Sequence, residues 1–139
     1  MGFAHLHVHT EYSLLDGSNK IREYVSRIKE LGMTAAAITD HGVMYGCIDF
    51  YKEALAQGIN PILGCEVYVS PGSRFDRDYS DSDERYYLLV LLAENNRGYD
   101  NLMRIVSAGF TEGFYYKPRI DRELLEKYHY MENMAILQN

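Results

Sequence analysis

The chain alternates between two periods of hydrophobic residues, which predicts a succession of short strands and amphipathic helices. Phe3 to Val8 alternates in a strand-like way, and Thr34 to Thr39 is a short run typical of a strand covered on both faces. Between them, apolar residues recur every three or four positions from about Asn19 to Leu31, which predicts a helix with one buried face. Its expected buried residues are Ile21, Tyr24, Val25, Ile28 and Leu31.

Turn and capping residues set the expected ends of the first two helices. Asp16-Gly17-Ser18 breaks the chain and is expected to supply an N-cap, and Gly32 follows as a stop. A second helix is predicted from about Tyr45 to Gln57, with Gly58 at its end. Its residues expected to be buried are Ile48, Tyr51 and Leu55.

The second half of the chain continues this pattern. Ile62 to Val69 indicates a third strand, and the apolar run Tyr86 to Ala93 is typical of a buried central strand. Asn95-Asn96 can cap a following helix. From Asp121 a short helix is expected, then a strand at Met134 to Leu137. The helix after Asn96 is expected to bury Tyr99, Leu102, Met103, Val106 and Phe110.

The order of these elements predicts an α/β fold with a mainly parallel sheet, in one globular unit. Ser70 to Glu84 is polar, acidic and without periodicity, so it is expected to be a solvated surface loop. Cys47 and Cys65 sit singly in apolar stretches, which favours a reducing cytoplasm over a disulfide framework. No apolar run approaches the roughly 20 residues that span a bilayer. A net charge of −6 argues against a broad basic surface for DNA.

Candidate metal ligands follow the first three predicted strands. His7 and His9 are two residues apart, so their imidazoles share one face, whereas His5 is expected to be a packed structural histidine. His41 follows the second strand and Glu66 lies in the third. The carboxyl ends of such strands meet at one rim, where α/β folds place their sites.

Two aspartates belong to the same predicted rim. Asp16 precedes the first helix and adds a carboxylate, while Asp40 is expected to support His41 rather than bind a metal itself. A mixture of imidazole nitrogen and carboxylate oxygen suits a divalent zinc, manganese or iron ion. Glu66 could bridge two ions, or it could be a buried acid paired with a strand neighbour.

Four segments give this pattern a family resemblance: FAHLHVHTEYSLLDG (3–17), AITDHGVMYGCIDFYKEA (37–54), PILGCEVYV (61–69) and GFTEGFYYKPRID (109–121). They resemble, in order, the N-terminal part of the PHP domain of the bacterial DNA polymerase III alpha subunit. The resemblance implies a partial PHP domain over residues 1–139, in a distorted barrel of seven strands, with no polymerase palm. It also implies metal ligands at His7, His9, Asp16, His41 and Glu66.

The sequence departs from the family pattern at Leu88, where family members usually carry histidine after the tyrosine pair. A later cysteine and an Asp-x-His ligand of the family are also not found, so the metal site is expected to be degenerate and partly occupied. Two hypotheses follow: a structural and interaction module of a replicase, which we favour, or a metal-dependent phosphoesterase or 3′-5′ exonuclease acting on DNA ends. An amidohydrolase barrel is a third possibility, without an identifiable lysine ligand.

Partners follow from the same resemblance. Other replicase domains or subunits are expected, with DNA reached only through a full-length parent protein. An interrupted barrel would expose strand edges, which favours a homo-oligomer.

Overall fold

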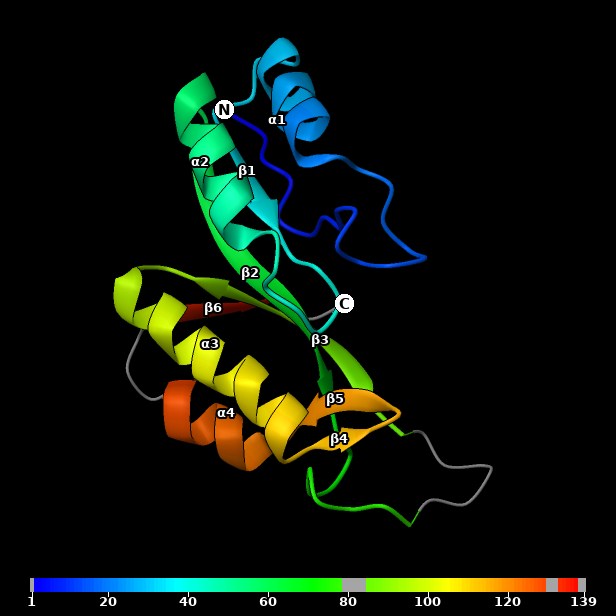
Figure 1. Cartoon of the computed structure of the whole chain (residues 1–139). Helices are drawn as coiled ribbons and strands as arrows, with labels where there is room; N and C mark the ends of the chain where they lie inside the picture. Colours follow the sequence, from blue (N-terminus) through cyan, green and yellow to red (C-terminus); the bar gives the residue numbers. More distant parts are fainter. Residues whose placement is uncertain (1, 79–84, 130–132, 138–139) are drawn as a thin grey trace.

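A computed structural model describes residues 2–78, 85–129 and 133–137 (Figure 1). The helices are α1 (Ile21–Glu30), α2 (Cys47–Gln57), α3 (Asn96–Thr111) and α4 (Arg122–His129). The strands are β1 (Ala35–Ile38), β2 (Asn60–Val69), β3 (Tyr87–Ala93), β4 (Phe114–Tyr115), β5 (Lys117–Ile120) and β6 (Met134–Leu137).

Strand β2 is the central strand of the sheet, because it pairs with three other strands along its length. Its first residues pair in parallel with β1, its second half pairs antiparallel with β3, and its last two residues pair in parallel with β5. Beyond these, β6 adds to β3 and β4 adds to β5, giving the order β4-β5-β2-β3-β6 with β1 beside β2. The two halves of β2 therefore carry different neighbours, as Figure 1 shows.

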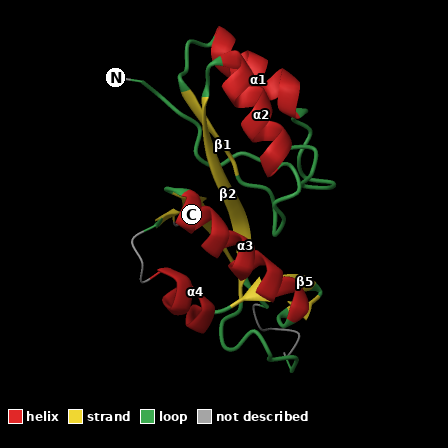
Figure 2. Ribbon diagram, turned by 60° about the vertical axis from the view of Figure 1, so that its left-hand side comes forward, coloured by secondary structure: helices red, strands yellow, loops and turns green. Residues whose placement is uncertain are grey.

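Each half of β2 has its own pair of helices and its own core. Helices α1 and α2 lie side by side against β1, and their core includes Val25, Ile38 and Phe50 (Figure 2). Helices α3 and α4 cover the other half, where Cys65, Leu91 and Leu102 are buried together. Strand β2 thus extends along both of these cores, and Ala37, Val90 and Leu92 form a third, smaller cluster.

The sheet is mixed, so the prediction of a mainly parallel sheet was wrong. Antiparallel pairing joins β2 to β3, β3 to β6 and β4 to β5. A parallel neighbour needs a crossover connection, usually a helix, and no helix was predicted between the third strand and the run from Tyr86. That missing helix was the available signal for antiparallel pairing. The α/β class is confirmed, and the seven-stranded barrel stays a prediction.

Phe3 to Val8 was predicted as a strand but forms no regular ladder. The segment lies beside β1 and makes separate backbone bonds, from Ala37 N to His5 O and from Thr39 N to Val8 O, both 2.9 Å long. The predicted cap of α1 was also wrong. Lys20 occupies the N-cap position and makes no side-chain capping bond, because the Asp16 to Ser18 turn ends before the helix begins.

The buried face of α2 differs from the predicted one. Cys47, Phe50 and Ala54 are buried, whereas Ile48, Tyr51 and Leu55 are 44–52% exposed. Both sets have helical spacing, and they differ by one residue, about 100° around the helix. Periodicity alone could not choose between two apolar stripes.

Helix α1 follows the prediction more closely, whereas in α3 only Leu102 is buried among the five residues expected to be. Ile21, Val25 and Ile28 of α1 are buried, although Leu31, just past its end, is half exposed. In α3 Asn95 caps Gly98 N as predicted, at 3.0 Å. Leu102 is buried there together with Ile105, whereas Met103 and Phe110 are each 39% exposed.

The described part of the predicted surface loop, residues 70–78, packs back onto the fold. Arg74 is buried and forms ion pairs with Asp121, Glu112 and Glu123, at 2.9, 2.6 and 3.1 Å. Asp121 also accepts from the backbone N–H of Arg74 at 3.0 Å and of Leu124 at 3.1 Å, so it caps α4. Residues 71, 72, 75, 76 and 78 are exposed, as predicted for a surface loop, but the buried Arg74 anchors this part to the fold. Residues 79–84 lie outside the described residues.

A search of the described helices found none long and apolar enough to cross a membrane.

Candidate metal centre

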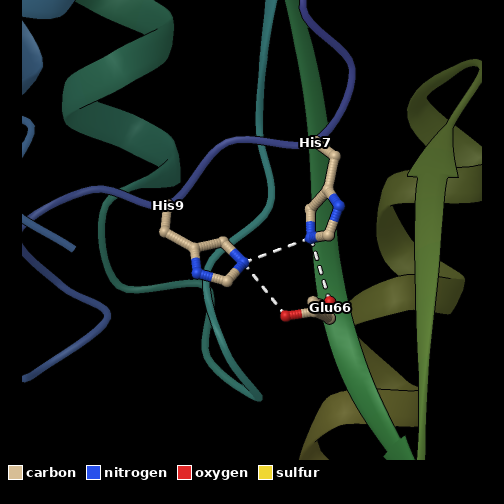
Figure 3. A group of neighbouring side chains, drawn as sticks. All are labelled: His7, His9 and Glu66. Carbon is tan, nitrogen blue, oxygen red and sulfur yellow. Dashed lines mark hydrogen bonds and ion pairs between the residues drawn. The ribbon is translucent and has the colours of Figure 1, made fainter. Parts of the chain in front are cut away.

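The two N-terminal histidines are positioned by the extended segment beside β1. Val8 N donates to Thr39 Oγ1 at 2.8 Å, and Val8 O accepts from Thr39 N at 2.9 Å. Because Val8 faces Thr39 in this way, His7 and His9 on either side of it point away, toward β2 (Figure 3). The prediction that the pair shares a face is confirmed. His5 is exposed, with its ring 4.8 Å from that of Phe3, so the prediction of a packed histidine was wrong.

The turn after His9 is fixed by the buried carboxylate of Asp40. Its Oδ1 accepts from Thr10 N at 2.6 Å and Ser13 Oγ at 2.8 Å, and its Oδ2 accepts from Thr10 Oγ1 at 2.7 Å. Ser13 Oγ in turn accepts from His41 N at 3.1 Å. Asp40 thus supports the His41 backbone through Ser13. Sequence reasoning missed Thr10 and Ser13, which have no local motif.

Backbone pairing holds His41 next to Glu66. The chain leaving β1 runs parallel to β2 here, with Glu66 N donating to Asp40 O at 3.0 Å and Gly42 N donating to Glu66 O at 2.8 Å. Gly42 has φ +63°, and a Cβ there would lie 2.9 Å from the Tyr68 ring. Glycine therefore allows both the turn and the close approach.

Three side chains converge at this point. His7 Nε2 lies 2.9 Å from Glu66 Oε1, His9 Nε2 lies 3.0 Å from Glu66 Oε2, and the two Nε2 atoms are 3.2 Å apart (Figure 3). Ligand atoms about 2.0–2.1 Å from one ion, at angles of about 90–110°, are themselves about 2.9–3.4 Å apart. The three groups therefore fit a single divalent ion, and a His/Glu group able to bind one is present.

His41 and Asp16 extend the group on one side. His41 Nδ1 lies 2.7 Å from Glu66 Oε2, but this buried nitrogen makes no hydrogen bond of good geometry. Its Nε2 lies 3.4 Å from Asp16 Oδ2, and the Asp16 side chain is 66% exposed. The structure thus brings all five predicted ligands together, with His7, His9 and Glu66 converging most closely.

The surroundings of His9 favour the neutral form of its imidazole. Burial lowers the pKa of His9, the neighbouring His41 and His7 act in the same direction, and Glu66 opposes them. Metal binding requires the neutral ring, since a protonated imidazole has no free lone pair. Glu66 is 1% exposed and lies within 3.0 Å of three imidazole nitrogens.

Tyr68 forms a wall of the site that sequence reasoning missed. Its ring stacks on His41 with centroids 6.1 Å apart, and burial raises the pKa of Tyr68 to about 12. Tyr68 stands two residues after Glu66 on β2, so the alternation of strand side chains was a usable signal for it.

Leu88 lies on the same face of the sheet as Glu66. The antiparallel register pairs Glu66 with Val90 and Tyr68 with Leu88. Residues directly opposite one another share a face, so a side chain at position 88 flanks the Tyr68 wall. Leu88 is 37% exposed, so it is not a core residue.

Comparison with known proteins agrees with this arrangement. The profile of the PHP domain family matches residues 5–138. The chain is 52% identical over 128 residues to the DNA polymerase III subunit alpha of Treponema pallidum, covering 92% of this chain and 11% of the relative. It is 49% identical over 129 residues to that of Thermus aquaticus, covering 91% and 11%. The chain thus spans about a tenth of the length of these relatives.

Solved structures share the fold. An amidohydrolase from Chromobacterium violaceum has a TM-score of 0.53 at 24% identity, covering 76% of this chain and 34% of that one. A protein from Bifidobacterium adolescentis, described as a metal-dependent phosphoesterase, has a TM-score of 0.50 at 21% identity, covering 77% and 34%. With a family profile matching nearly its whole length, and relatives about half identical to it, this chain belongs to the PHP domain family.

Proposed function

We propose that this chain is a structural PHP segment of a replicative DNA polymerase alpha subunit that retains one divalent-ion site and lacks a complete catalytic site. The proposal rests on the difference between two neighbouring positions on one face of the β2–β3 pair. Three groups fit one ion on the Glu66 side, and the next pair along the same face is Tyr68 with Leu88.

One ion is the number that the described residues support. His7, His9 and Glu66 supply three ligands, and His41 or Asp16 can supply a fourth. A second ion next to Glu66 would need donors near Tyr68 and Leu88. Leucine has no lone pair, and its apolar side chain disfavours the water or phosphate that could replace a ligand.

The donor set favours zinc, manganese or iron over magnesium or calcium, since two or three of the ligands are imidazoles. Partial occupancy is expected, because Asp16 is exposed and its oxygen is the most distant of the group. Incomplete multi-ligand sites lose activity before they lose all affinity, since catalysis needs tighter geometry than binding.

A second candidate is a metal-dependent phosphoesterase or 3′-5′ exonuclease acting on DNA ends. The openness of the site favours it, since the His7 side chain is 34% exposed beside a converging donor set. An ion there could be reached by a phosphodiester from solvent. The name of the Bifidobacterium adolescentis neighbour agrees with this candidate.

Metal analysis combined with an exonuclease assay separates the two candidates. The protein would be loaded with Zn²⁺ or Mn²⁺, freed of excess metal, and assayed on labelled single-stranded DNA. A structural role predicts about one ion per chain at most and no cleavage. Manganese-dependent cleavage that His9→Ala abolishes would establish the enzyme instead.

The proposed setting is a larger replicase in the cytoplasm. The relatives are alpha subunits about eight times as long as this chain, so other domains or subunits of such a protein are the expected partners. Polymerase activity is not proposed for residues 1–139. Self-association through exposed strand edges remains a proposal, and light scattering tests it.

A further inference from the structure

Ser13 connects two candidate ligands that come from different parts of the chain. The residue is 2% exposed, and its Oγ donates to Asp40 Oδ1 at 2.8 Å and accepts from His41 N at 3.1 Å. Its backbone is engaged as well, since Ser13 N donates to Thr10 O at 2.9 Å and Ser13 O accepts from Asp16 N at 3.0 Å. One buried serine is therefore bonded to the backbone of both His41 and Asp16.

The turn that carries Asp16 is held by hydrogen bonds rather than by packing. Leu14 and Leu15 form its tip, and their side chains are 81% and fully exposed, so they contribute little to holding it. Ser13 O accepts from Gly17 N at 2.7 Å as well as from Asp16 N, which closes the turn on itself. The position of the Asp16 carboxylate therefore depends on where Ser13 is fixed.

The backbone of this turn has a restricted geometry. Leu15 has φ +73°, a conformation that is disfavoured for a residue with a Cβ and persists only where the surrounding structure fixes it. Gly17 is restricted in another way, because a Cβ there would overlap the Thr10 carbonyl. In the geometry that results, Asp16 Oδ2 lies 3.4 Å from His41 Nε2.

We propose that Ser13 is a positioning residue of the metal centre, which sets Asp16 and His41 at a fixed separation before an ion binds. This role rests on the proposed ion site, because Asp16 and His41 are the groups able to supply its fourth ligand. Ligands that are held in place lose less conformational freedom when the ion binds. Loss of a residue that orients a metal ligand typically weakens metal binding 10–100-fold.

A general contribution of Ser13 to folding is the alternative. Removing the hydroxyl would leave Asp40 Oδ1 and the His41 N–H without this partner, which lowers stability in either case. The two roles differ in what the loss of metal affinity depends on. A positioning effect acts through Asp16 and His41, so it disappears once those side chains no longer bind the ion, whereas an independent effect adds to theirs.

Titration calorimetry with Zn²⁺ tests the proposal through a double-mutant cycle. Ser13→Ala should weaken Zn²⁺ binding about tenfold in the wild-type background. In a protein that already carries Asp16→Asn and His41→Ala, the same change should cost less than about twofold. The visible absorption of bound Co²⁺, which reports the geometry of its ligands, should also change in Ser13→Ala. Ser18→Ala replaces an exposed serine of the same segment and should bind as wild type does.

Hydrogen exchange of the wild-type protein decides the question even if Ser13→Ala does not fold. In EDTA, the amides of His41, Asp16 and Gly17 should already be protected, because Ser13 holds them before the ion binds. Protection that appears only with Zn²⁺, or a tenfold loss that persists in the Asp16→Asn, His41→Ala background, would overturn the proposal. Unchanged affinity in Ser13→Ala would overturn it and leave the ion site intact, whereas a wild type that binds no Zn²⁺ would refute both.

Discussion

His41 and Glu66 lie side by side in a parallel backbone bridge, with His41 Nδ1 2.7 Å from Glu66 Oε2. The same carboxylate reaches His7 and His9, so one buried acid joins three imidazoles that come from two segments of the chain. Glu66 is thus the centre of the candidate metal site.

Replacing this acid should weaken metal binding more than any other single change at the site. Glu66→Gln keeps the shape but removes the charge, and we expect affinity for Zn²⁺ or Mn²⁺ to fall at least about tenfold. Asp16→Asn, at the exposed edge of the group, should cause a smaller fall. Titration calorimetry measures both. Equal affinities in Glu66→Gln and wild type would show that the ion, if bound, is held elsewhere.

Position 88 distinguishes a site for one ion from a site for two. Leu88→His should add affinity for a second Zn²⁺ or Mn²⁺, because a further donor then flanks the Tyr68 wall. It should not produce nuclease activity, because the later cysteine and the Asp-x-His ligand are still not found. Tyr87→His is the control, since its side chain points to the opposite face of β3. A second ion bound equally well by both variants, or DNA cleavage by Leu88→His, would refute this.

The exposure of Leu88 also revises the expected cost of truncating it. A buried leucine would lose about 2–5 kcal/mol on replacement by alanine. Because this side chain is 37% exposed, Leu88→Ala should lower the free energy of unfolding by only about 1 kcal/mol. Urea denaturation measures the difference, and a loss above about 3 kcal/mol would show that the residue is buried in solution.

The Arg74–Asp121 pair should make stability depend on acid pH. Burial alone would raise the pKa of Asp121, but hydrogen bonds from Arg74 N, from Leu124 N and from the Arg74 side chain lower it overall. A folded pKa below the ordinary value means that the stabilisation is present above about pH 4 and is lost as pH falls through the folded pKa.

Two substitutions at Asp121 separate charge from capping. Asp121→Asn keeps the cap of α4 and removes the charge, and should cost about 3 kcal/mol at pH 7 but little below the folded pKa of Asp121. Asp121→Ala should cost about 1 kcal/mol more at every pH, because the cap is also lost. Denaturation curves from pH 2 to 7 measure both. A difference between wild type and Asp121→Asn that is constant across this range would contradict the linkage.

The two cysteines should be inert toward thiol reagents in the folded protein. Burial raises the pKa of the Cys47 thiol to about 12 and that of Cys65 well above its usual range. Only the thiolate attacks such reagents, so labelling at pH 8 should require unfolding. Labelling with and without denaturant, followed by mass spectrometry, tests this. Rapid labelling of either cysteine in native protein would contradict the buried positions.

Local sequence patterns predicted most helices and strands because their causes are local. The Asn95 cap, the stop at Gly58 and the strand at Met134 to Leu137 depend on neighbouring residues alone, and all are present in the structure. The resemblance to the PHP family likewise followed from short segments read in order. The five candidate ligands were identified in the same way.

Choices between equivalent alternatives needed the tertiary structure. Two apolar stripes of α2 have the same spacing, and contact with β1 and α1 decides that Phe50 is buried while Tyr51 is exposed. Likewise, the direction of β3 depends on pairing with β2 rather than on its own residues.

Sequence patterns also did not predict the hydrogen bonds that support the site. Asp40 is 30 positions from Thr10 and 27 from Ser13, and it meets them only when the N-terminal segment lies beside β1. Arg74 and Asp121 are 47 positions apart, so a loop that appeared solvated is in fact anchored. How the chain packs decides which distant residues meet. The loops that bring them together impose no periodic pattern on the sequence, so these contacts could not be predicted from it.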